Sequence, residues 1–280
     1  MSSTAPPVAR GPGQTAKTPR RRRHVRLPGW ALGALSVAGA LVLWELLSRT
    51  GVLPERFFPS MSATFAELGD ALGTARFWDA VFNTLQGWAL GLGIAAGLAI
   101  PIGILIGSSR LAYRGARVLI EFLRPIPSVA LIPLAVLVYG TGLESKVFLA
   151  AFASFWPLLI QTLYGVQDVD PVSIDTARSF GLSRLERLWR IKLPGAVPYI
   201  ATGMRISSAV ALILSVTAEL VIGSAGLGRA INVAQSGGAL ELMYALIIAT
   251  GILGWLLNIV ATQAEKRVLH WHPTHRAATA

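Results

Sequence analysis

The sequence predicts an all-α, polytopic membrane protein with six transmembrane helices. Hydrophobic residues make up 53% of the 280 residues and charged residues only 14%, whereas soluble domains average about 25% charged residues. The mean hydropathy is +0.58. Charged residues are scarcest in six apolar runs, most of which are long enough to cross a bilayer. This composition excludes a soluble enzyme, a disordered regulator and a fibrous protein. The absence of cysteine excludes disulfides, iron–sulfur clusters and thiol nucleophiles.

Residues 1–28 are predicted to form a disordered, basic cytoplasmic tail. Seven Lys and Arg residues precede the first apolar run, with no aromatic residue among them to stack on bases, so anionic lipid rather than nucleic acid is the expected partner.

Residues 29–80 are predicted to form the next region, with the first span and an outer segment. The run Trp30–Ser48 is too long for a signal-peptide core and predicts an uncleaved span. The segment from Pro54 to Asp79 is predicted to be an extracytoplasmic amphipathic helix, which contacts a partner or packs on the bundle.

Residues 81–265 are predicted to be the core, with five further spans. These are the apolar runs Val81–Gly107, Pro125–Gly140, Val147–Val166, Ile200–Gly223 and Leu242–Thr262. Glycines four residues apart in the first of them favour close helix packing in lipid. Three prolines in the short run Pro125–Gly140 predict irregular backbone, which is tolerated at membrane depth only inside a bundle or beside a cavity.

The distribution of Lys and Arg predicts the orientation. If the N-terminus is cytoplasmic, nineteen of the 25 basic residues lie inside, including those of a first inner loop from Arg110 to Arg124 and of the C-terminal tail, residues 266–280. Five lie outside, and Lys146 is assigned to one of these outer loops. The positive-inside rule therefore places both termini in the cytoplasm.

The longest cytoplasmic connection, residues 167–198, is predicted to hold two short helices. Asp170 is a good N-cap followed by Pro171, and Gly181 stands where a C-cap glycine is expected. Ser183 and Glu186 have the spacing of a capping box for the second helix, which Pro194 is expected to end. Such a loop is either an amphipathic connector on the membrane surface or a docking element for a cytoplasmic partner.

The spacing within this loop resembles a known family. Asp175-Thr176-Ala177 is followed after three residues by Gly181 and, after nine more, by Ile191-Lys192-Leu193-Pro194. This resembles the EAA motif of binding-protein-dependent, type I ABC importer permeases, with Asp175 and Thr176 in place of the usual Glu and Ala. Segments such as Leu123-Arg124-Pro125-Ile126-Pro127, Ser145-Lys146, Ala218-Glu219 and Gly226-Leu227-Gly228 look like the nitrate/sulfonate/taurine branch of these permeases.

The resemblance implies a type I permease fold, a homodimer in a prokaryotic cell membrane, and an extracytoplasmic binding protein that delivers a small anionic solute. It also implies cytoplasmic ABC ATPase subunits that use ATP and Mg, because this chain has no Gly-x4-Gly-Lys-Ser/Thr phosphate loop and no cofactor of its own. The residues implied to dock the ATPase are Asp175, Thr176, Ala177, Gly181, Ile191, Leu193 and Pro194.

Glu219, an acid inside an apolar run, is interpreted either as a pathway or gate residue or as a carboxyl satisfied by Ser or Thr of a neighbouring helix. Ser128 and Ser215 are further candidates for the substrate pathway. The alternative function is a secondary transporter or channel that uses Glu219 and the proline-rich third run without ATP. No catalytic set is present, and His270, His272 and His275 lack the additional ligands that a metal site needs, so neither catalytic nor metal-binding residues are predicted.

Overall fold

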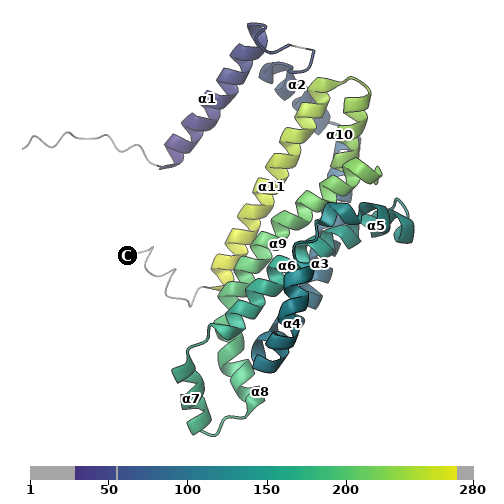
Figure 1. The fold of residues 1–280 in the computed structure, drawn as a ribbon. Helices are drawn as coiled ribbons and strands as arrows, with labels where there is room; N and C mark the ends of the chain where they lie inside the picture. Colours follow the sequence, from purple (N-terminus) through teal and green to yellow (C-terminus); the bar gives the residue numbers. More distant parts are fainter. Residues whose placement is uncertain (1–28, 55, 270–280) are drawn as a thin grey trace, which may run out of the picture. The chain divides into compact units, whose positions relative to one another are not determined.

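The computed structural model describes residues 29–54 and 56–269 (Figure 1). The chain divides into two units between Leu43 and Trp44. The described part of the first unit is the beginning of α1 (Gly29–Arg49), an apolar helix whose described side chains are mostly exposed. Its bounds agree with the predicted first span to within one residue. The predicted N-terminal tail and the C-terminal histidines lie outside the described residues.

The secondary-structure elements described in the second unit are all helices. They are α2 (Met61–Leu72), α3 (Ala75–Ser108), α4 (Arg110–Leu123), η1 (Ser128–Leu131), α5 (Ile132–Tyr139), α6 (Leu143–Gln167), α7 (Pro171–Ser179), α8 (Arg184–Arg187), η2 (Leu188–Lys192), α9 (Leu193–Ile222), α10 (Leu227–Ser236) and α11 (Leu240–Val268). Within the described residues, five helical stretches of the chain are long and apolar enough to cross a membrane, and one bent pair brings the number to six.

Helices α3 and α6 pack in parallel along a seam of glycines. Four glycines of α3 each contact a residue of α6: Gly87 meets Lys146, Gly91 meets Ala150, Gly103 meets Thr162 and Gly107 meets Val166. In every pair the α6 residue follows the glycine by the same number of positions in the sequence, so the two helices run in the same direction. A Cβ atom on Gly91 would lie 2.6 Å from the Cβ of Ala150, closer than two carbon atoms can approach. The small residues predicted from the sequence thus allow the backbones of α3 and α6 to touch.

Helix α9 packs against both α6 and α3 and runs antiparallel to α6. Gly165 of α6 meets Tyr199 near the start of α9, and farther along the helix the Ser207 hydroxyl donates to the Ser154 carbonyl over 2.7 Å. Helix α6 is therefore the centre of the bundle, with 56% of its most apolar window buried. Figure 1 shows α3, α6 and α9 side by side, with α11 along α9.

The parallel arrangement of α3 and α6 decides the path of the chain between them. Because both helices run in the same direction, the residues that join them must travel back along the bundle. That return is made by α4 and by η1 with α5, which are bent by 79° relative to each other. The irregular backbone predicted for the run Pro125–Gly140 is confirmed: its helical part begins only at Ser128, with η1 followed by α5. The predicted inner loop from Arg110 to Arg124 is largely the helix α4.

Two further sequence predictions need correction, and one helix was not predicted. Lys146 does not lie in a loop but is buried near the start of α6, which begins at Leu143. The amphipathic helix expected over Pro54 to Asp79 is confined to α2, because α3 begins at Ala75. Helix α10, between the last two long helices, was not predicted.

Candidate functional site

The segment from Asp168 to Lys192, called here the α7–α8 loop, forms at one end of the second unit. Asp170 caps α7: its carboxylate accepts hydrogen bonds from the backbone N–H of Val172 at 3.0 Å and of Ser173 at 3.3 Å. These bonds, together with the Ser173 hydroxyl, hold the pKa of Asp170 below its usual value. Pro171 occupies the first turn, where its missing N–H costs nothing. The predicted start of α7 is confirmed.

Gly181 ends α7 in the left-handed conformation, with φ of 77°. The backbone N–H of Leu182 donates to the Ala177 carbonyl at 3.0 Å, and the N–H of Gly181 donates to the Arg178 carbonyl at 3.0 Å. These two bonds define a Schellman cap, which favours glycine because a Cβ atom strains this conformation. The turn between the two short helices therefore depends on Gly181, as predicted.

The second short helix begins with the predicted capping box. The backbone N–H of Glu186 donates to the Ser183 hydroxyl at 3.2 Å, and the Ser183 N–H donates to the Glu186 carboxylate at 2.8 Å. The predicted end of this helix at Pro194 is wrong. The chain passes through the π-helical turn η2 directly into α9, and Pro194, which has no backbone N–H to donate, lies in the first turn of α9 immediately after that π-turn.

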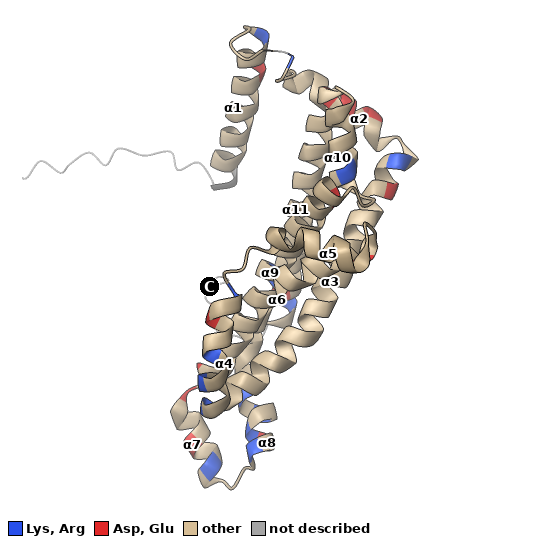
Figure 2. Ribbon diagram, turned by 45° about the vertical axis from the view of Figure 1, so that its right-hand side comes forward, with Lys and Arg blue, Asp and Glu red and all other residues tan. Residues whose placement is uncertain are grey.

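Most of the residues predicted to dock an ATPase are accessible. Asp175, Thr176, Gly181 and Pro194 are exposed or half-buried, Ile191 and Leu193 are half-buried, and Ala177 is buried. Apolar side chains that the sequence analysis had not chosen stand beside them. Phe180 is 80% exposed, Leu185 64% and Trp189 62%. The α7–α8 loop thus combines exposed aromatic and aliphatic groups with several basic residues (Figure 2).

At the opposite end of α6, Lys146 and Glu219 form a buried ion pair. The Nζ atom of Lys146 lies 2.8 Å from Oε1 of Glu219, and the two side chains are 1% and 0% exposed. The same Nζ donates to the carbonyls of Asn83 at 2.8 Å and Ala225 at 2.9 Å. Both charges are therefore satisfied within the protein, which a buried ion pair requires to avoid a large desolvation cost.

Thr84 and a glycine turn complete this cluster, which we call the Lys146–Glu219 cluster. The Thr84 hydroxyl donates to Oε2 of Glu219 at 2.9 Å and accepts from the backbone N–H of Leu227 at 2.9 Å. The N–H of Gly228 donates to Oε2 of Glu219, also at 2.9 Å. A Cβ atom on Gly226 would overlap the Glu219 carboxylate, and one on Gly228 would lie 2.7 Å from the Glu219 Cβ. The cluster joins α3, α6 and α9 to the start of α10.

The three residues predicted to line a substrate pathway are not brought together by hydrogen bonds among the described residues. Ser215 is buried one turn from Glu219 on α9, and its hydroxyl has no partner there. Ser128 begins η1 and is half-buried. The surroundings of Glu219 fit the second interpretation made from the sequence, that of a carboxyl satisfied by Ser or Thr of a neighbouring helix, because the Thr84 hydroxyl is one of its partners. The principal partner of Glu219 is Lys146. It was not predicted, because in the sequence a lysine at the edge of an apolar run looks the same as a lysine in a solvent-exposed loop.

Within the described part of the chain, no three His, Asp or Glu side chains gather closely enough to hold a metal ion. The structure has an exposed two-helix loop at one end of the bundle and a tightly bonded buried cluster at the other. One continuous helical stretch, Arg184–Ile222, connects them.

Comparisons with known proteins identify a family. The family model described as "Binding-protein-dependent transport system inner membrane component" matches residues 99–269. The taurine transport system permease protein TauC of Escherichia coli (strain K12) is 32% identical over 247 residues, which cover 86% of this chain and 89% of TauC. The nitrate import permease protein NrtB of Synechocystis sp. is 31% identical over 254 residues, covering 86% of this chain and 91% of NrtB.

Solved structures agree on the fold. The crystal structure of an amino acid ABC transporter matches with a TM-score of 0.61 over 71% of this chain and 97% of that chain, at 22% identity.

Proposed function

Because this chain belongs to the family of binding-protein-dependent transport system inner membrane components, we propose that its α7–α8 loop docks a cytoplasmic ABC ATPase subunit. The chain is a multi-pass permease subunit of an ABC importer and is not itself an enzyme. ATP and Mg are used by the ATPase, and an extracytoplasmic binding protein delivers the solute. In this proposal two copies of the chain pair as a homodimer, with both termini and the α7–α8 loop in the cytoplasm.

The observation that carries the docking role is the fixed, two-helix shape of the α7–α8 loop. A connector that rests on a membrane would turn its apolar side chains toward the bundle or the lipid. Here Phe180, at the C-terminal end of α7, and Trp189, in η2, are both exposed, and Asp175 on α7 is exposed on the same loop. A surface groove on the ATPase would bury these apolar groups and use the charged ones to set its orientation.

The continuous helix from Arg184 to Ile222 supplies a path for coupling. A stretch of 39 residues reaches about 58 Å as a helix. When the ATPase subunits close on ATP, a displacement of α8 would be transmitted along α9 to Glu219. The π-turn η2, Pro194 and Pro198 are the places where this helix can bend. This is an alternating-access mechanism driven by the partner, in contrast to the ATP-independent transporter or channel considered from sequence.

We propose a small anion as the solute, in the class of nitrate, sulfonates or taurine. The support is the similarity to TauC and NrtB over most of the chain, at 32% and 31% identity. Specificity is assigned mainly to the binding protein. Ser128, Ser215 and Glu219 remain the proposed pathway residues, with Ser215 favoured because its buried hydroxyl is without a partner among the described residues.

The docking role is tested with Gly181→Val. A side chain at a left-handed position costs about 1–2 kcal/mol, which is too little to unfold the bundle but enough to misplace α7 relative to α8. We expect the variant to insert and dimerise normally, to lose co-purification with the ATPase, and to lose substrate-stimulated ATP hydrolysis in liposomes. Thr176→Ala, which restores the alanine usual at this position of the EAA motif, should behave as the wild type. Full association and coupled turnover by Gly181→Val would reject the proposal.

A further inference from the structure

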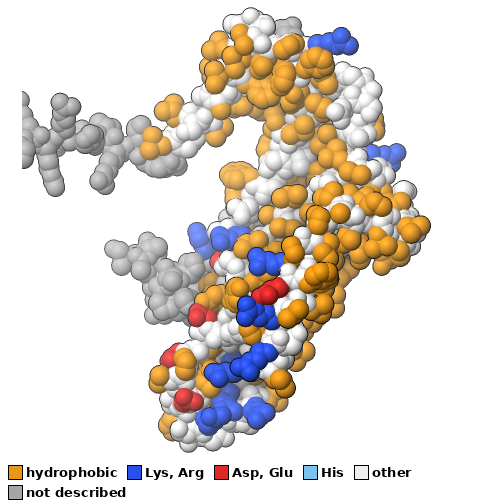
Figure 3. Space-filling view, viewed as in Figure 1, with side chains coloured by type: hydrophobic (Ala, Val, Ile, Leu, Met, Phe, Trp, Pro, Cys, Tyr) orange, Lys and Arg blue, Asp and Glu red, His pale blue; other side chains and the backbone are white. Residues whose placement is uncertain are grey.

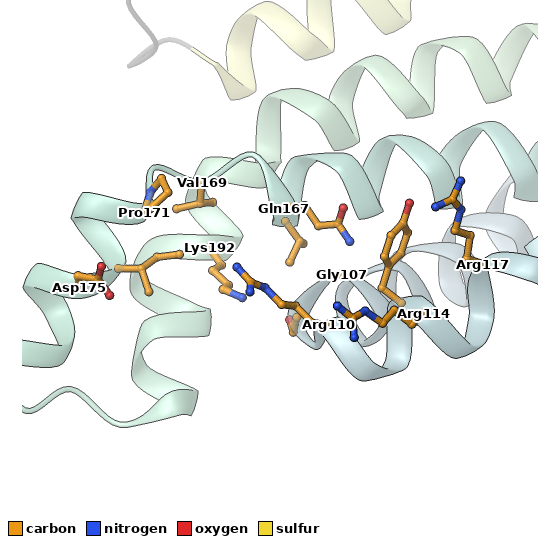
Figure 4. Close-up of a pocket in the computed structure, with 13 residues that line it drawn as sticks. Gly107, Arg110, Arg114, Arg117, Gln167, Val169, Pro171, Asp175 and Lys192 are labelled. Atoms are coloured by element: carbon orange, nitrogen blue, oxygen red, sulfur yellow. The ribbon is translucent and has the colours of Figure 1, made fainter.

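A cavity of about 670 Å³ opens at the end of the bundle that carries the α7–α8 loop. It is framed by the end of α3 at Gly107, the start of α4 at Arg110, the end of α6 at Gln167, and α7. We call it the basic cavity, because Arg110, Arg114 and Lys192 line it. Figure 4 shows the side chains of Arg110 and Lys192 pointing toward one another, although they come from elements far apart in the sequence.

The three cations lack anionic partners. Among the described residues, no Asp or Glu oxygen lies within ion-pair distance of Arg110, Arg114 or Lys192. Arg117, at the cavity's edge, is different, because it is paired with Glu121 at 2.7 Å. The one acid in the lining, Asp175, lies on α7, away from the arginines in Figure 4. Three positive charges facing one space repel each other unless an anion lies between them.

The start of α4 adds to this positive potential. The first turn of α4 contains Arg110 and no acidic residue. The N-terminus of a helix carries a partial positive charge, so a basic residue there is unfavourable unless a negative group neutralises both. The cavity therefore combines three basic side chains with the positive N-terminus of α4. The C-terminal ends of α3 and α6 also border it and carry partial negative charge, but the full positive charges of the side chains outweigh them, which favours the binding of phosphate-like anions.

The setting of α4 indicates where such an anion comes from. Leu111 is 82% exposed, Val118 73% and Phe122 72%, while the arginines lie on another face of the same helix. A basic, amphipathic helix at the end of membrane spans lies where lipid headgroups meet water. Figure 3 shows Lys and Arg side chains next to hydrophobic ones on this part of the surface.

We propose that the basic cavity binds the tetrahedral oxyanion of a phosphate group, supplied by the headgroup of an anionic phospholipid. Arg110, Arg114 and Lys192 contact the phosphate oxygens, and the acyl chains lie along the exposed apolar face of α4. The site would anchor α4 and the base of the α7–α8 loop to the membrane surface. A free oxyanion of the same chemistry, such as inorganic phosphate, is the other source that the experiment must distinguish. Lys192 belongs to the α7–α8 loop, so the cavity adjoins the proposed docking element, but phosphate binding is measured on this chain without an ATPase and can fail independently of docking.

The test uses the full chain, purified from mixed lipid. Lipids that survive delipidation are identified by native mass spectrometry, and binding is measured in nanodiscs of phosphatidylglycerol or phosphatidylcholine. The cavity variant is Arg110→Gln with Arg114→Gln. The matched control is Arg178→Gln with Arg184→Gln, which removes the same charge from the α7–α8 loop outside the cavity lining. Arg110→Lys with Arg114→Lys keeps the positive charge and tests whether charge alone, without the guanidinium groups, is sufficient for binding.

We expect the wild type to retain phosphatidylglycerol over phosphatidylcholine. The cavity variant should lose about fivefold in retention for each arginine removed, whereas the control and the lysine variant keep the preference. If millimolar inorganic phosphate raises the thermal stability of the wild type but not of the cavity variant, and no lipid preference is seen, the site exists and its source is a free oxyanion. If wild type, cavity variant and control respond alike to both lipid and phosphate, the proposal is overturned.

Discussion

Lys146 on α6 and Glu219 on α9 are 73 residues apart in the sequence and joined by a 2.8 Å ion pair that is closed to solvent. Four further groups hydrogen-bond to the pair. Thr84 and the Gly228 N–H donate to Glu219, and the carbonyls of Asn83 and Ala225 accept from Lys146. It lies at the end of the bundle opposite to the α7–α8 loop. In the proposed mechanism, this pair marks the point on α9 to which a displacement of α8 is transmitted.

The first prediction concerns this pair. Removing one partner leaves an uncompensated buried charge, so Lys146→Met and Glu219→Gln should each destabilise the protein, by up to about 3–5 kcal/mol. The double variant should recover much of that loss, because the side-chain amide oxygen that replaces the carboxylate can still accept from Thr84 and Gly228. Thermal unfolding in detergent of the three variants measures this coupling. Additive losses in the double variant would contradict it.

Glu219→Gln also has a functional expectation. It should impair transport and leave ATPase assembly intact, since the residue is at the far end of α9 from the α7–α8 loop. Transport in proteoliposomes and co-purification of the ATPase are the two measurements. Wild-type transport by a stable Glu219→Gln protein would remove Glu219 from both the pathway and the coupling mechanism.

The second prediction concerns the glycine turn that covers Glu219. A Cβ atom on Gly228 would lie 2.7 Å from the Glu219 Cβ and 2.9 Å from the Leu220 nitrogen, so Gly228→Ala must push α10 away from α9. We expect a loss of about 1–3 kcal/mol. Gly251→Ala on α11 is the matched control, because nothing lies within 4 Å of the added atom. Melting temperatures of the two variants should differ; equal values would show that the turn can shift freely.

The third prediction tests the parallel seam between α3 and α6. Gly91 and Gly93 are two residues apart on α3, but only Gly91 meets another helix, at Ala150. Gly91→Val should separate the two helices and reduce the yield of folded, monodisperse protein. Gly93→Val adds the same side chain to the same helix. It should be tolerated, because nothing lies within 4 Å of a Cβ atom at this position. Size-exclusion profiles in detergent provide the comparison, and similar profiles for both variants would argue against the seam.

The fourth prediction is the path of the chain through the membrane. The chain has no cysteine, so single cysteines can be placed without background. Gly181→Cys and Arg114→Cys should be labelled only after the cells are opened. Phe65→Cys, Thr141→Cys and Arg229→Cys should be labelled in intact cells. Arg114 and Thr141 lie at the two ends of the bent pair, so labelling of both from the same side would show that α4 and α5 do not cross.

Much of this protein could be predicted from the sequence because lipid restricts what a chain can do. A long apolar run in a bilayer must satisfy its backbone internally, and a helix is the way a single segment does so. The bounds of α1 and the caps at Asp170, Gly181 and Ser183 were therefore predictable from composition and local hydrogen bonding. The spacing of Asp175, Gly181 and Pro194 indicated the family, which the comparisons show.

The sequence could not determine how segments far apart in the chain connect and pack against one another. Pro194 signals the end of a helix, yet the chain continues into α9, because a proline in the first turn of a helix is also favourable. Pro125 and Pro127 indicate a break but not its 79° bend, which follows from the need to return between two parallel helices. Lys146 was assigned to a loop because a charge at a run's edge is ordinarily solvated. Only the packing of α3, α6 and α9 supplies the carboxylate and carbonyls that make its burial favourable.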